Sequence, residues 1–220
     1  MKRLLYTVCL LCVSVFLEAQ GAVKGRPEIP GNANLKQLLA KPSFIYTGVD
    51  SVKEGGKTWV VMEVDVQTCS PLSLEQIKAV ITDYANYAKI FKRTTASRVA
   101  GGNERGIIAF FEITVGVMGV TAVTAYSVLM ETPLDSPGKF LLNFSHVSDN
   151  GSIRKVHGFW YLETVTIDER PHTYLRYYAY SEPLRVMALQ KQVTSLFIGA
   201  EYEAMIEEVL AAAALRGATR

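Results

Sequence analysis

The sequence of 220 residues has few of the residues that build reactive or metal-bound sites. It contains three cysteines, which are too few for a disulfide-stapled fold or a clustered zinc site. It contains three histidines, and none of them shows the HxH or HExxH spacing of a metal site. A nucleophile elbow, a phosphate-binding loop and a dinucleotide-binding turn are also missing. We therefore expect no metal ion, no cofactor and no nucleophile-based catalysis.

An excess of one charge sign is missing as well. Lys and Arg number 23 against 21 Asp and Glu, a net charge of +2, so nothing in the balance points to nucleic acid as a partner. Four basic residues do gather after the first predicted long helix, and they could make a transient contact with anionic lipid: Lys89, Lys92, Arg93 and Arg98. The simpler interpretation of this cluster is a solvated surface.

The one long apolar run lies at the start of the sequence. Leu4 to Leu17 spans about 14 residues, shorter than the roughly 20 that a membrane-spanning helix needs. Lys2 and Arg3 precede this run and small residues follow it from Ala19, which is the three-part pattern of a secretory signal. The sequence thus predicts a signal peptide over residues 1–21 and an exported protein, periplasmic or extracellular.

The cysteines fit this interpretation. Removal of residues 1–21 would take away Cys9 and Cys12 and leave Cys69 alone, so we expect Cys69 to be a buried, inert thiol. Two alternatives stay open for the N-terminus. The apolar run could remain as an uncleaved anchor, or Cys12 could be a lipid-modified acceptor.

The mature chain reads as a short lead-in and one domain. Residues 22–34 are rich in Gly and Pro and predict an extended lead-in, and residues 35–216 form a single domain. A capping box from Ser73 to Gln76 begins an amphipathic helix. A long helix follows Pro183 and continues to about residue 215, with a break or kink around Gly199 or, alternatively, an N-terminal half that is covered from two sides.

Between the two helices the pattern changes to β-strands. One strand is expected at 58–68 and six more follow with short turns between them, which makes them antiparallel neighbours: 96–100, 107–115, 120–132, 140–147, 154–167 and 174–181. A sheet of about seven strands accumulates twist and curls. The terminal helix is the one element long enough to cover its concave side.

Several short segments together resemble the START-like superfamily, which includes START lipid-transfer domains, polyketide cyclases and coenzyme Q-binding proteins. They are Ser70-Pro71, Ile81 to Tyr87, Ser97 to Val99, Ile113 to Val120 and Gly158 to Leu162. The resemblance covers about residues 58–210. It implies an α+β helix-grip fold, with a curved antiparallel sheet wrapped on a long C-terminal helix, and a cavity for a hydrophobic ligand. It does not imply one activity.

Strand alternation and helix periodicity select the side chains expected to line such a cavity. On the strands these are Ile113, Val115, Tyr126, Val128, Leu142, Phe144, Trp160, Leu162, Leu175 and Tyr177. On the terminal helix they are Ile198, Tyr202, Met205, Ile206 and Val209. The alternative is that the same side chains fill a closed core.

Two polar residues join this set. His146 shares strand parity with Leu142 and Phe144, so it is the histidine that could face the cavity as a hydrogen-bond donor or a general base. Arg154 shares parity with Trp160, and an arginine at a cavity mouth could hold a carboxylate or phosphate group. A structural histidine and a solvated arginine are the simpler interpretations.

The leading hypothesis is a non-catalytic exported protein that binds or carries a hydrophobic small molecule, a lipid or an isoprenoid, between the sheet and the terminal helix. The alternative is an enzyme of the aromatase/cyclase kind, for which His146, Arg154 and Tyr126 are the available polar groups. Their convergence within hydrogen-bond reach would favour chemistry. A cavity wall made only of apolar side chains would favour a binding or carrier protein.

Overall fold

The computed structural model describes residues 29–30, 33–117, 120–183 and 191–218. Within these ranges, the side chains of residues 43–49, 115–117, 120–122 and 191–198 are not described. The predicted signal peptide at 1–21 and most of the lead-in therefore lie outside the described residues. No helix in the described part of the chain has the length and apolar character needed to cross a membrane.

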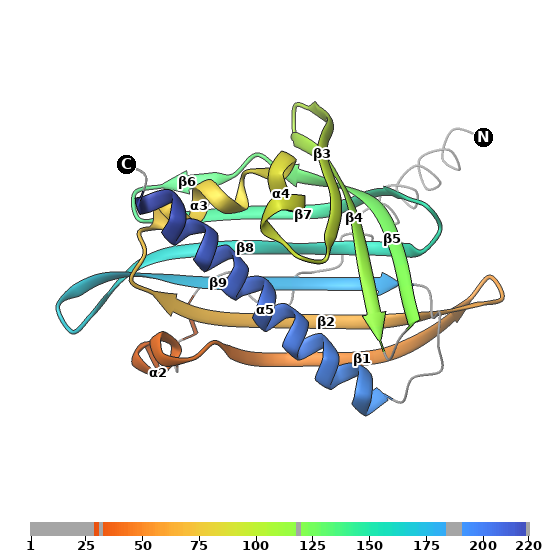
Figure 1. Cartoon of the computed structure of the whole chain (residues 1–220), viewed down its shortest axis with the longest axis horizontal. Coiled ribbons are helices and arrows are strands. Elements are labelled where there is room, and N and C mark those ends of the chain that lie inside the picture. Colours follow the sequence, from red (N-terminus) through yellow and green to blue (C-terminus); the bar gives the residue numbers. More distant parts are fainter. Residues whose placement is uncertain (1–28, 31–32, 118–119, 184–190, 219–220) are drawn as a thin grey trace, which may run out of the picture.

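The strands form one antiparallel sheet (Figure 1). Its strands are β1 (Ser43–Glu54), β2 (Lys57–Ser70), β3 (Thr94–Asn103), β4 (Gly106–Val117), β5 (Val120–Glu131), β6 (Leu134–Ser136), β7 (Lys139–Asp149), β8 (Ile153–Ile167) and β9 (Arg170–Pro183). Their order across the sheet is β1-β2-β9-β8-β7-β5-β4-β3, and the short β6 pairs with β7 outside this path. The chain thus places β2 beside β9 at the centre, although 100 residues or so separate them in the sequence.

The sheet has two strands more than the sequence predicts. The sequence predicts that residues 43–49 are extended. They form the first part of the edge strand β1, which pairs with β2 through a tight hairpin. Gly55 and Gly56 make this turn, with φ of +59° and +73°, and positive φ values favour glycine because it lacks a Cβ. The described side chains of β1, at residues 50–54, are all exposed, so burial imposes no alternation of apolar residues there and the sequence signal is weak.

The helices are α2 (Leu35–Ala40), α3 (Leu74–Ile81), the 3-10 turn η1 (Tyr84–Asn86), α4 (Tyr87–Ile90) and α5 (Lys191–Ala218). The predicted capping box is present: Gln76 N donates to Ser73 Oγ at 3.3 Å, and Ser73 N donates to Gln76 Oε1 at 2.9 Å. The predicted break at Gly199 is wrong, because α5 continues through it as one helix. A glycine inside a helix costs about 1 kcal/mol relative to alanine but does not by itself end the helix.

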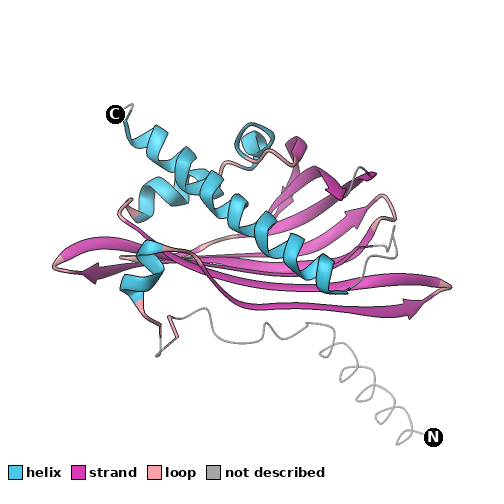
Figure 2. Cartoon of the chain, turned by 60° about the horizontal axis from the view of Figure 1, so that its bottom comes forward, coloured by secondary structure: helices cyan, strands magenta, loops and turns pink. Residues whose placement is uncertain are grey.

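The two faces of the sheet carry separate apolar clusters. We call the face toward α5 the helix face and the opposite one the outer face. Val64, Leu142 and Leu175 lie on the helix face and are fully buried against residues of α3 and α5. On the outer face, Phe159 and Tyr174 belong to a second cluster that includes Leu38 of α2. Figure 2 shows α5 lying along one side of the sheet. This arrangement confirms the α+β helix-grip fold that the sequence predicts.

The C-terminal half of α5 is fixed firmly in place. Ile206, Val209 and Ala213 have no exposed surface. Arg216 forms an ion pair with Asp83 and donates a hydrogen bond from Nη1 to the carbonyl oxygen of Ala79 at 2.7 Å. These contacts hold the last turns of α5 against the end of α3.

Cys69 lies on the outer face, where 3% of its surface is exposed. It is a free, buried cysteine, and burial raises the pKa of its thiol from 9.0 to about 11. For protein that lacks residues 1–21, and with them Cys9 and Cys12, we expect no reaction with Ellman's reagent at pH 8 in the folded state and one equivalent after unfolding, because only an exposed thiolate attacks a disulfide. Because the pKa is raised in the folded state, this thiol adds no pH dependence to stability below pH 9. It lowers stability as the pH rises from 9 to 11. Rapid labelling without unfolding would contradict the burial.

Candidate functional site

An aromatic group stands at the centre of the helix face, where α5 crosses the sheet. The ring of Tyr177 on β9 lies 4.4 Å from that of Trp160 on β8 and 6.1 Å from that of Phe144 on β7, measured between ring centres. Tyr202 of α5 completes the group, with its ring 5.7 Å from Tyr177. Three neighbouring strands and the helix therefore meet through aromatic side chains.

A second aromatic row extends this group toward β4 and β5. Tyr87 of α4 stacks on Phe111 of β4 at 5.1 Å, and Phe111 lies 6.2 Å from Tyr126 of β5. Tyr87 donates its hydroxyl hydrogen to the carbonyl oxygen of Ile81 at 2.5 Å. Among the described residues, no hydrogen bond is recorded for the hydroxyls of Tyr126, Tyr177 and Tyr202. These three tyrosines can therefore offer hydrogen bonds at the helix face.

Burial keeps the tyrosines of the helix face neutral. It raises the pKa of Tyr202 to about 12, and it raises the pKa of Tyr126 and of Tyr177 further above the usual value of 10.0. Mutual repulsion between the ionised forms adds to this effect for Tyr126 and Tyr177. At neutral pH these side chains are hydrogen-bond donors and acceptors rather than bases.

The side chains of α5 that pack against the sheet are not all buried to the same degree. Ile206, Val209 and Ala213 are fully buried, whereas Tyr202, Met205, Leu210 and Ala212 pack against the same cluster and are only partly buried. Ile113 and Tyr126, on β4 and β5, are likewise partly buried although they pack against the same cluster. Among the described side chains of α5, the fully buried positions therefore begin at Ile206, and the contacts at Tyr202 and Met205 leave part of the apolar surface exposed.

The structure places nearly all the predicted apolar lining residues in the cluster on the helix face. They are Ile113, Tyr126, Val128, Leu142, Phe144, Trp160, Leu162, Leu175, Tyr177, Tyr202, Met205, Ile206 and Val209. The side chains of Val115 and Ile198 lie outside the described residues. Their common face follows from strand alternation and from the helical repeat. That they bind a ligand stays a prediction.

His146 also lies on the helix face, and it brings a residue that the sequence pattern does not reveal. His146 pairs with Val128 across β5 and β7, and Asp149 pairs with Tyr126. Between these pairs β7 carries one extra residue, a β-bulge, so two positions three residues apart share a face. His146 Nε2 lies 3.0 Å from Asp149 Oδ2. Simple alternation assigns Asp149 to the other face, and no signal in the sequence marks the bulge.

A second bulge moves Arg154 away from the helix face, contrary to the prediction. Ile153 pairs with Pro183 and Val156 with Ser181, so β8 has one residue more than β9 in this interval. The extra residue inverts the alternation, and Arg154 no longer shares a face with Trp160. Its guanidinium forms ion pairs with Glu54 and Glu182 on the outer face.

The basic cluster is partly engaged in contacts with α5. Arg93 donates from Nε to Glu201 at 2.8 Å, and the backbone N–H of Lys92 donates to Glu208 at 3.3 Å. Arg98 stacks on the ring of Phe110, with its guanidinium carbon 3.8 Å from the ring centre. Arg93 thus links the start of β3 to α5. Contact of this cluster with a membrane stays a prediction.

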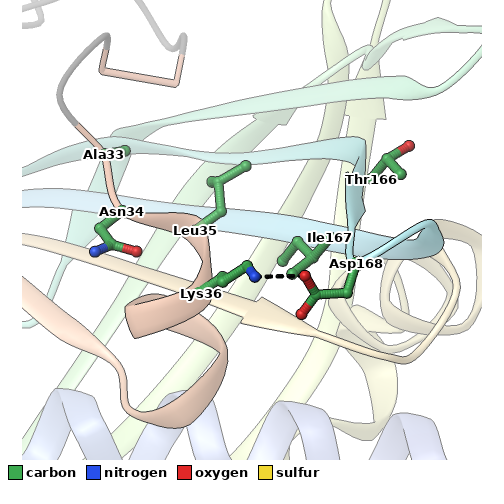
Figure 3. A pocket seen from close by; sticks show the side chains of 7 residues that line it. All are labelled: Ala33, Asn34, Leu35, Lys36, Thr166, Ile167 and Asp168. Atoms are coloured by element: carbon green, nitrogen blue, oxygen red, sulfur yellow. Dashed lines mark ion pairs between the residues drawn. The ribbon is translucent and has the colours of Figure 1, made fainter.

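A shallow pocket lies beside the outer-face cluster, to which Leu35 and Ile167 belong (Figure 3). It has a volume of about 550 Å³, is largely open to solvent, and is lined by Ala33, Asn34, Leu35, Lys36, Thr166, Ile167 and Asp168. Lys36 and Asp168 form an ion pair across it. Because its apolar surface is small and open, we do not assign the predicted hydrophobic ligand to this pocket.

Within the described ranges, no three His, Cys, Asp or Glu side chains come close enough together to hold a metal ion. His146 and Asp149 are therefore a pair without a third ligand among the described residues. At this site, the groups that could do chemistry are one imidazole, one carboxylate and neutral tyrosine hydroxyls.

Neither a family model nor a curated protein sequence matches the chain. Solved structures do. A STAR-related lipid transfer protein from Xanthomonas axonopodis is similar with a TM-score of 0.52 and 11% identity, over 76% of this chain and 98% of that one. Zhui aromatase/cyclase from Streptomyces sp. R1128 is similar with a TM-score of 0.45 and 15% identity, over 70% of this chain and 91% of that one. A START superfamily protein from Mycobacterium smegmatis is similar with a TM-score of 0.48 and 10% identity, over 68% of this chain and 94% of that one.

Proposed function

We propose that this chain, which has the START-like fold, is a non-catalytic carrier for a hydrophobic small molecule of the lipid or isoprenoid class. The ligand would lie between the helix face of the sheet and α5. The first-named structural neighbour is a lipid transfer protein by its description, which supports a lipid as the class of ligand. At 11% identity this likeness shows the fold, so the ligand is argued from the side chains.

The observation that carries the proposal is the uneven burial along α5. Tyr202 and Met205 are partly exposed although they pack against an apolar cluster, whereas Ile206, Val209 and Ala213 of the same helix are fully buried. Ile113 and Tyr126 face them from the sheet with the same partial exposure. A hydrophobic ligand that enters here would gain roughly 0.8 kcal/mol for each methylene group it buries. The aromatic rings around Tyr177 offer it flat, apolar contact surfaces.

The polar residues of this region support a non-catalytic carrier rather than an enzyme. The enzyme alternative needs His146, Arg154 and Tyr126 to converge, and Arg154 points to the outer face, where it pairs with Glu182. Beside the apolar wall, the described residues offer His146 with Asp149 and the neutral hydroxyls of Tyr126, Tyr177 and Tyr202. We further propose that the protein acts after export, as the N-terminal pattern of residues 1–21 predicts. A carrier is useful there because lipids cross water poorly without one.

The test is saturable binding of a fluorescent hydrophobic probe to the mature protein after lipid removal. A glutamate introduced at the ligand site must be buried with its charge, so Tyr202→Glu and Met205→Glu should each weaken binding at least tenfold. Ala204→Glu is the matched control, since Ala204 is exposed on the same turn of α5, and it should leave binding unchanged. Circular dichroism verifies that each variant is folded. Equal binding by all three variants, or no saturable uptake by the wild type, would overturn the proposal.

A further inference from the structure

We propose that His146 and Asp149 form the polar end of the ligand site and that the ligand carries a hydroxyl group there. This inference rests on the proposed function, because it assumes that a hydrophobic molecule occupies the helix face. It adds the identity of the polar group and the two residues that bind it.

Both residues lie at one end of the helix face. Asp149 is the direct partner of Tyr126 across β5 and β7, and His146 is the partner of Val128, which is buried in the helix-face cluster. Directly opposed residues of antiparallel strands point to the same side of the sheet. The side chains of His146 and Asp149 are 20% and 17% exposed, so most of each is removed from water while an accessible part remains.

The imidazole has an unused hydrogen-bonding group. His146 Nε2 is 3.0 Å from Asp149 Oδ2, but it is buried and makes no hydrogen bond within the described part of the chain. The two groups are in contact without the alignment that a hydrogen bond needs. A buried polar atom without a partner has lost its hydrogen bonds to water and gained none in return, so such an atom in a folded protein calls for a partner.

A hydroxyl group fits this pair best. It can accept a hydrogen bond from a protonated Nε2 and donate its own hydrogen to the Asp149 carboxylate, so one small group satisfies both residues. A ligand carboxylate would face the negative charge of Asp149, which is unfavourable. A plain hydrocarbon end would leave Nε2 unpaired. The pair therefore selects an alcohol over an acid or an alkane of the same length.

The pair is continuous with the aromatic group, which gives the ligand a direction. Phe144 is two residues from His146 on the same strand and face, and its ring stacks near Tyr177, which in turn contacts Tyr202 of α5. A hydroxyl held at His146 would therefore place the apolar body of the molecule along these rings. The inferred ligand is amphipathic, with one hydroxyl at the end near β5 and β7 and an apolar remainder toward α5.

The experiment measures displacement of the fluorescent probe by three molecules of one chain length: hexadecan-1-ol, hexadecanoate and hexadecane. We expect the wild type to bind the alcohol about tenfold more tightly than the alkane or the acid, the effect of one or two hydrogen bonds. His146→Leu and Asp149→Leu should remove this preference and leave the affinity for hexadecane within twofold. His146→Gln keeps an N–H donor and should retain part of the preference.

His157→Phe is the matched control, because it removes an imidazole from the outer face and keeps a ring beside Tyr180, and it should leave the preference intact. The inference is overturned if the wild type binds alcohol and alkane equally. It is also overturned if His146→Leu lowers the affinities for both molecules together, since that would mark a packing role. In the first case probe binding persists and the carrier proposal stands. If no wild-type binding of probe, alkane or alcohol occurs, the carrier proposal falls together with this inference.

Discussion

Replacing Gly158 with alanine is expected to destabilise the protein by more than about 3 kcal/mol, because the sheet leaves no room for a Cβ there. Gly158 pairs with Phe144 on one side and with Ala179 on the other, in the middle of the sheet. An added Cβ would overlap the carbonyl oxygen of Tyr178 and lie 2.6 Å from Cζ of Phe144. A ring can rotate away, but the backbone of β9 is held by its hydrogen bonds on both sides. The strain would therefore remain in the folded state.

Denaturant unfolding measures this effect, and two other glycines provide controls. Gly101 on β3 and Gly199 on α5 have no atom within 4 Å of an added Cβ. Gly199→Ala should stabilise the protein by about 0.5–1 kcal/mol, the usual difference between glycine and alanine inside a helix. Gly101→Ala should be close to neutral. If Gly158→Ala unfolds at the same denaturant concentration as Gly101→Ala, the close packing of β8 on β9 is wrong.

Replacing Arg176 with methionine is expected to cost about 3–5 kcal/mol, because it leaves a buried carboxylate without its partner. Arg176 and Asp65 are 8% and 7% exposed on the outer face. The guanidinium donates to both carboxylate oxygens, from Nε to Oδ1 at 3.0 Å and from Nη2 to Oδ2 at 2.6 Å. The ring of Phe159 lies beside the pair, with its centre 5.6 Å from the guanidinium carbon. Water is thus a poor substitute for the lost partner.

A double variant measures the interaction between Asp65 and Arg176 separately from the contacts that each residue makes with its surroundings. Asp65→Leu combined with Arg176→Met removes both charges and should recover most of the stability lost in Arg176→Met, since an apolar pair of similar volume often replaces a buried ion pair without loss. Unfolding midpoints of the two single variants and the double variant give the coupling energy. Purely additive losses would mean that the two charges do not depend on each other, contrary to the geometry.

Local sequence signals predict the helices α3 and α5 of this fold. The capping box at Ser73 and Gln76 depends on side chains three residues apart, and the structure has both of its hydrogen bonds. The alternating strands gave the right face for residues such as Leu142 and Tyr177, because regular strands keep their period over several residues. The edge strand β1 was only partly predicted, since its hairpin partner, and not its own pattern, makes it a strand.

The candidate site shows where such patterns fail. Arg154 was placed on the wrong face and Asp149 was missed, and in both cases a single extra residue in one strand inverted the alternation. A bulge depends on the register between two strands, which is a property of their pairing and leaves little trace in either sequence alone. The ion pair of Asp65 with Arg176 is hidden for a similar reason, because β2 and β9 meet only in the folded chain.

The sequence by itself determined the order of the elements, the amphipathic stripe of α5 and the apolar character of the face beneath it. These properties follow from periods of two and 3.6 residues, which are local. The tertiary structure decided which polar groups join that face, which described side chains of α5 are fully buried, and which charges are buried in pairs. Each of these properties depends on residues far apart in the chain, which come into contact only when the strands pair in their final register.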